Sequence, residues 1–149
     1  MLLSNITLIP IVEELCKFIG VYIVSRYRTL FNEIDDGIVY GASVGLGFAT
    51  LETILYALAS KDPLAVGLLR ASCCTAMHAA STAFTGWGYA FNIIGRRGSS
   101  IFIGTLIMAI ILHSIHNYIA SMLRFIPSLF AILIIIDMTI FIYITSHVE

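Results

Sequence analysis

The chain has 149 residues, of which 59% are hydrophobic and only 11% are charged, and its formal net charge is −1. A soluble domain is usually about a quarter charged, so this composition excludes an ordinary soluble protein and indicates that lipid covers much of the surface. A net charge so close to zero gives no sign of nucleic acid binding or of a strongly basic membrane-surface function. We therefore predict an all-α, polytopic membrane helix bundle with a single integral-membrane core over residues 1–149.

Five apolar segments are long enough to cross a bilayer, for which a helix needs about 20 mostly apolar residues. In chain order they are residues 4–25, 38–59, 63–94, 101–122 and 127–146. The third segment is longer than one crossing needs. Its stretch TGWGYAFN contains Gly86 and Gly88, and because glycine weakens a helix interior, we predict a bend or an interfacial end there.

The basic residues of the connecting loops are unevenly distributed. One side carries Arg26, Arg28, Arg96 and Arg97, and the other carries Lys61 and Arg124. Because cytoplasmic loops are enriched in lysine and arginine, this bias places the loops after the first and third segments, and the C-terminus, in the cytoplasm.

Three ionisable residues, Glu13, Glu14 and Lys17, interrupt the first apolar segment. Each charged side chain at mid-bilayer costs about 2.5–3.5 kcal/mol on insertion scales. Lys17 follows Glu13 by four residues and Glu14 by three, so it could form an ion pair with either one within the helix. One glutamate is left unpaired in both cases, which indicates a functional site rather than a purely structural pair.

The second segment presents a face of small residues, Gly41, Gly45 and Ala49, at four-residue spacing. Such a face lets two helices approach closely in lipid. The same face continues to Glu52 and Tyr56. We therefore predict that Glu52 faces a neighbouring helix rather than lipid.

Further polar residues lie in the later segments. They are Arg70 and His78 in the third, His113, His116 and Asn117 in the fourth, and Asp137 in the fifth. At about 1.5 Å per residue, the glutamates of the first two segments and His113 come out roughly 11–14 Å below the outer ends of their segments. His78 comes out about 22 Å deep if its helix starts at Pro63 and about 15 Å deep if it starts near Leu68. We therefore predict one converging site. His116 could face a different neighbour, and Asp137 has no evident partner.

Two histidines and a carboxylate form the set that holds catalytic zinc with one position open. We predict Glu52, His78 and His113 as the ligands of one zinc ion, with Glu13 or Glu14 as the general base. Zinc would activate water and polarise a substrate carbonyl.

Two polar residues could assist this site. Asn117 lies one helical turn after His113 and could orient that histidine or donate to a developing oxyanion. Lys17 could hold a glutamate in place or offer positive charge to the transition state.

Other interpretations of the same residues remain open. A single intramembrane histidine is often only a hydrogen-bonded packing residue. Buried Glu, His and Lys could also form the relay of a proton-coupled transporter or channel subunit, for which a homo-oligomer could supply the pathway. A catalytically inactive relative that acts as a membrane chaperone is a third interpretation. The chain contains no His-Glu-x-x-His and no Gly-x-Ser-x-Gly motif of soluble hydrolases.

Four stretches carry a family resemblance: PIVEELCK, DDGIVYGASVGLGFATLETILY, RASCCTAMHAASTAFTGWG and ILHSIHNY. In this order, over about residues 9–118, the chain resembles the PrsW-type intramembrane metalloproteases, a family related to the CAAX prenyl endopeptidases and the bacteriocin-processing enzymes. By this resemblance the functional positions are Glu13, Glu14, Lys17, Phe48, Glu52, His78, His113 and Asn117. Thr53 departs from the asparagine usual in the family.

The resemblance implies an enzyme that hydrolyses a peptide bond in or near a prokaryotic cell membrane. Its substrate would be a membrane-anchored protein or peptide, its partner the lipid bilayer, and its cofactor one zinc ion. No nucleic acid partner is expected.

Overall fold

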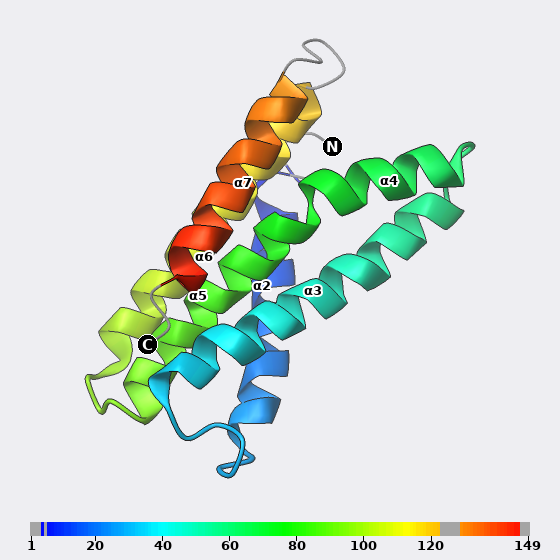
Figure 1. The fold of residues 1–149 in the computed structure, drawn as a ribbon. Helices are drawn as coiled ribbons and strands as arrows, with labels where there is room; N and C mark the ends of the chain where they lie inside the picture. The colour runs from blue at the N-terminus through cyan, green and yellow to red at the C-terminus, as the bar shows by residue number, and fades with distance from the viewer. Residues whose placement is uncertain (1–3, 5, 123–128, 147–149) are drawn as a thin grey trace.

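The computed structural model describes residues 4, 6–122 and 129–146. In chain order its helices are α2 (Leu8–Ser25), α3 (Ile34–Leu58), α4 (Pro63–Cys73), α5 (Thr75–Ile93), α6 (Ser99–Met122) and α7 (Leu129–Thr145) (Figure 1). No strand occurs among the described residues, which confirms the all-α prediction. The first two residues of the segment predicted at 127–146 lie outside the described residues.

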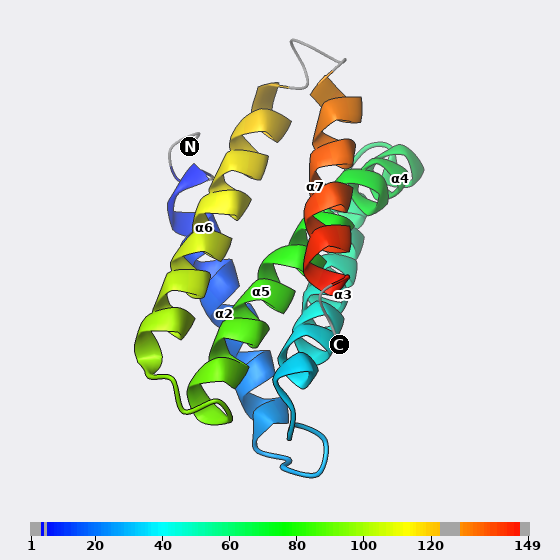
Figure 2. The same ribbon diagram turned by 60° about the vertical axis from the view of Figure 1, so that its left-hand side comes forward.

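Helix α5 occupies the centre of the bundle and contacts each of the other described helices (Figure 2). Most of its side chains are buried, and nearly all of the buried ones are small Ala, Ser, Thr or Gly residues. Small side chains let neighbouring helix backbones come close on every side. The sequence of α5 therefore suits a helix that is surrounded by protein rather than by lipid.

The small-residue face of α3 packs directly against a neighbouring helix, as predicted, and that helix is α5. A Cβ atom added to Gly45 would lie only 2.8 Å from the carbonyl carbon of His78 and 2.9 Å from the Cα atom of Ala79. Gly41 meets the α5 backbone in the same way, one turn further along. This close contact fixes the position of α5, and with it that of His78, along the axis of α3.

The bend predicted at Gly86 and Gly88 is wrong, because α5 continues as a helix through both glycines, whereas the alternative of an interfacial end stays a prediction. Gly86 packs against the backbone of Gly37 in α3, and Gly88 packs against the side chain of Thr105 in α6. These two glycines allow close helix contacts rather than a change of direction.

The break in the third predicted segment lies instead at Cys74, between α4 and α5. Across it, the backbone N–H of Cys74 still donates to the carbonyl oxygen of Arg70 at 2.8 Å, and that of His78 donates to Cys74 at 3.1 Å. The chain therefore bends without losing these bonds. Helix α4 has 11 residues, about 16 Å, which is too short to cross a bilayer alone. It runs beside the C-terminal half of α3 (Figure 1).

Helix α3 begins at Ile34, four residues before the predicted segment, because a capping box starts it. The backbone N–H of Glu33 donates to the Asp36 carboxylate at 2.8 Å. Acidic residues in a first turn also interact favourably with the helix dipole. By length and hydropathy, α3 and α6 qualify among the described helices as candidates to cross a membrane.

Candidate metal centre

A pocket of about 200 Å³ lies among α2, α3, α4, α5 and α6. Five residues predicted for the site line it: Glu13, Glu52, His78, His113 and Asn117. These residues come from four different helices. The predicted convergence of polar groups from separate segments is therefore present in the fold.

His78 of α5 and His113 of α6 face each other at the base of this pocket. Both are buried, and their ring centroids lie 5.0 Å apart with the ring planes at 83°. A carboxylate oxygen of Glu13 and one ring nitrogen from each histidine lie within 4.8 Å of one another, so this group could hold a metal ion. It differs from the predicted ligand set by one carboxylate, since Glu13 takes the place of Glu52.

Each histidine has a carboxylate beside its Nε2 atom. Oε2 of Glu52 lies 2.9 Å from Nε2 of His78, and Oε2 of Glu13 lies 3.5 Å from Nε2 of His113. Two ligand atoms bound to one tetrahedral zinc at about 2.0–2.1 Å are about 3.4 Å apart. The Glu13–His113 pair has about this spacing, whereas Glu52 and His78 lie closer together, as an ion pair does.

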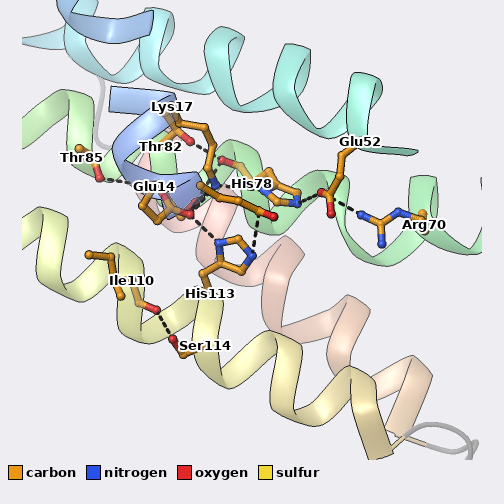
Figure 3. A network of polar contacts seen from close by, with 12 residues as sticks. Glu14, Lys17, Glu52, Arg70, His78, Thr82, Thr85, Ile110, His113 and Ser114 are labelled. Carbon is orange, nitrogen blue, oxygen red and sulfur yellow. Dashed lines mark hydrogen bonds and ion pairs between the residues drawn. The ribbon is translucent and has the colours of Figure 1, made fainter. Parts of the chain in front are cut away.

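Glu14 lies behind the histidines, and only 1% of it is exposed. Its Oε1 atom accepts hydrogen bonds from Nδ1 of His113 at 2.8 Å, from the Ser81 hydroxyl at 3.1 Å and from the Lys17 ammonium (Figure 3). Lys17 therefore pairs with Glu14, not Glu13. Glu14 orients His113 through its Nδ1 atom, as the outer partner of a metal-binding histidine usually does.

Lys17 is also buried, and its Nζ atom lies 3.0 Å from Nδ1 of His78. Lys17 and Glu14 thus contact the far sides of the two rings, while Glu13 and Glu52 lie on the pocket side. Of the three charged residues of α2, Glu13 therefore faces the pocket, and Glu14 and Lys17 support the two histidines.

Sequence reasoning gave no role to two residues that complete this network, Ser81 and Arg70. Ser81 follows His78 by three residues and therefore shares its helical face, which is the signal that could have revealed it. An Arg70 guanidinium nitrogen lies 2.8 Å from Oε2 of Glu52. The unexplained cost of an arginine in an apolar segment was the signal in that case.

His116 turns away from His113 toward α7. Its Nδ1 atom lies 2.8 Å from Oδ2 of Asp137, and both side chains are buried. Asp137, which had no evident partner in the sequence, thus pairs with His116, and this pair joins α6 to α7. His116 also lines the pocket.

A protein-family model matches most of the chain, and individual relatives match shorter parts of it. Residues 1–144 match the family model described as "PrsW family intramembrane metalloprotease". The chain is 50% identical to a protease PrsW of Geobacillus kaustophilus over 56 residues, which are 38% of this chain and 25% of that protein.

Two more relatives carry the same name. The protease PrsW of Bacillus subtilis is 57% identical over 44 residues, 30% of this chain and 20% of that protein. That of Halalkalibacterium halodurans is 36% identical over 66 residues, 44% of this chain and 31% of that protein. These alignments thus span less than a third of each curated relative. No solved structure gives a significant match. The family match over nearly the whole chain, on residues that assemble one polar pocket, shows that the chain belongs to the PrsW family of intramembrane metalloproteases.

Proposed function

We propose that this protein is an intramembrane zinc-dependent endopeptidase that hydrolyses a peptide bond in or near the membrane, in a membrane-anchored protein or peptide. The observation that carries the proposal is the convergence of two histidines and two glutamates, His78, His113, Glu13 and Glu52, on one pocket. The family assignment supports the same reaction class. In this proposal α2, α3, α6, α7 and the bent pair of α4 with α5 make five crossings, with the C-terminus in the cytoplasm.

Glu52, His78 and His113 are the proposed zinc ligands. Glu52 suits a ligand because a metal-binding carboxylate is normally held by an outer partner, and an Arg70 guanidinium nitrogen forms an ion pair with it at 2.8 Å. Glu13 suits the general base because its contact with His113, at 3.5 Å, is longer than a hydrogen bond. Its carboxylate is therefore less constrained and faces the same pocket.

The remaining residues act on this group. Zinc at this position supplies Lewis-acid activation of water and of the scissile carbonyl. Glu13 takes the proton from the attacking water and delivers it to the leaving amine. Asn117 lies on the pocket wall one turn after His113, where its amide donates to the developing oxyanion. Glu14 and Lys17 hold the two imidazole rings from behind.

The proposed ligand set is tested by the metal content of purified variants in detergent. Wild-type protein should contain about one zinc per chain and cleave a single-span membrane protein reporter, and a chelator should stop the cleavage. His113→Ala and Glu52→Gln should lose zinc and activity. Glu13→Gln should keep zinc and lose cleavage, because it removes the base and not a ligand.

The matched control is His116→Ala, which removes a pocket histidine that is not a proposed ligand and should keep its zinc. If Glu13→Gln loses zinc while Glu52→Gln keeps it, the two carboxylates exchange roles. A wild-type protein that binds no metal and instead moves protons or solutes across vesicles would contradict the protease proposal.

A further inference from the structure

Arg70 is a half-buried cation that contacts one of the pocket carboxylates, Glu52. It lies on α4, near the bend at Cys74, and its side chain is only 15% exposed. It also lines the pocket. An arginine in an apolar segment is costly, so its surroundings should explain why it is there.

The guanidinium group and His78 contact the same oxygen atom of Glu52. An Arg70 nitrogen lies 2.8 Å from Oε2, and Nε2 of His78 lies 2.9 Å from it (Figure 3). Glu52 thus lies between a group on α4 and a group on α5. The two contacts together fix where this oxygen sits.

The aromatic ring of Tyr56 packs against the Arg70 guanidinium group. It follows Glu52 by four residues, on the same face of α3, and the Arg70 guanidinium carbon lies 4.1 Å from the centre of its ring. Stacking on an aromatic face restricts a guanidinium to one plane. The bend at Cys74 sends α4 along the C-terminal half of α3 (Figure 1). Arg70 of α4 there contacts Glu52 and Tyr56 of α3.

We propose that Arg70 is a positioning residue of the metal centre: held on Tyr56, it fixes the Glu52 carboxylate beside Nε2 of His78. This inference rests on the proposed function, specifically on Glu52 as a zinc ligand. Arg70 acts through Glu52 and needs no contact with substrate.

A lysine cannot replace Arg70 in this role. Its ammonium is a compact point charge that does not stack on a ring as a plane and has no rigid fork of donors. Arginine at this position therefore supplies direction as well as charge. Loss of an outer partner of a metal ligand typically weakens metal binding about 10–100-fold.

The experiment measures zinc affinity by competition with a chromophoric chelator, for wild type, Arg70→Ala, Arg70→Lys and Glu52→Gln. Arg70→Ala should bind zinc about 10–100-fold more weakly than wild type, and Arg70→Lys should recover only part of the loss. Millimolar guanidinium chloride should restore zinc affinity to Arg70→Ala, whereas ammonium chloride at the same ionic strength should not. Tyr56→Leu should weaken zinc binding more than Tyr56→Phe, which keeps the ring.

The matched control is Arg97→Ala. Arg97 also lies over an aromatic ring, 6.0 Å from the centre of Phe91, but it is outside the pocket, so its loss should not change zinc affinity. Arg70→Ala with wild-type zinc affinity, or without rescue by guanidinium, would overturn the positioning role while leaving the protease proposal intact. Wild-type protein without zinc would instead contradict the proposed function itself.

Discussion

Lys17 and Glu14 form a fully buried ion pair one helical turn apart, and each of them contacts a different histidine of the pocket. A pair of charges buried in this way is neutral as a unit, but each member alone is costly. The pair therefore allows α2 to carry two charges in the interior of the bundle and to orient both imidazole rings.

Removal of one member should destabilise the protein more than removal of both. Lys17→Met leaves Glu14 as an unpaired buried charge, and breaking such a pair costs about 3–5 kcal/mol. The double variant Glu14→Gln with Lys17→Met should be more stable than Lys17→Met alone. Unfolding titrations of wild type, Glu14→Gln, Lys17→Met and the double variant in mixed micelles measure this coupling. Additive losses would show that the two side chains do not interact.

The hydroxyl of Ser81 should contribute to stability through Glu14. Ser81→Ala removes a donor 3.1 Å from a buried carboxylate oxygen, and hydrogen bonds to charged groups contribute about 1.5–3 kcal/mol. The control is Ser114→Ala, whose hydroxyl donates only to the Ile110 carbonyl of its own helix (Figure 3). It should change the free energy of unfolding little. Equal effects of the two changes would rule out a special role for Ser81.

Gly45 and Gly47 offer a matched test of the contact between α3 and α5. Gly45→Ala places a methyl group against the backbone of His78, and such overpacking costs about 1–3 kcal/mol. It should also lower zinc affinity, because His78 is displaced. Gly47→Ala meets nothing within 4 Å and should stabilise the helix by up to about 1 kcal/mol, because alanine is the better helix former. Thermal unfolding and zinc titration of both variants measure the difference.

The pair of His116 and Asp137 should hold α7 on the bundle. Asp137→Asn weakens a buried contact of 2.8 Å between α6 and α7, with an expected cost of about 1.5–3 kcal/mol. Thr139→Val is the control on the same helix, since the Thr139 hydroxyl donates to its own helix at Ile135. Limited proteolysis after α6 should be faster in Asp137→Asn than in Thr139→Val. Equal rates would contradict the anchoring role.

The sequence predicts those parts of the site that depend on helical spacing. Gly41, Gly45 and Glu52 share one face of α3 by spacing alone, and the fold packs that face against a neighbouring helix as expected, namely α5. The grouping of Glu13, His78 and His113 could be anticipated as well, because costly residues at similar depth in separate helices indicate a common site.

The remaining features depend on contacts between helices, which residue spacing within one helix does not predict. Lys17 can reach either glutamate within α2, and contacts of Glu14 with other helices, such as that with His113, distinguish the two. A glycine such as Gly86 weakens a helix in isolation, yet it serves a close contact once α3 packs beside it. The bend at Cys74 likewise reflects the packing of α4 along α3, which no local sequence pattern predicts.

The central position of α5 has a thermodynamic consequence. His78 belongs to the helix that contacts all the other described helices, and the other site residues come from α2, α3 and α6. A cation bound there would interact with the assembled bundle and hardly at all with separated helices. Binding free energy would then add to folding free energy for the whole chain. Zinc should therefore raise the unfolding temperature of every helix together, so that metal supply and lifetime of the protein in the membrane become linked.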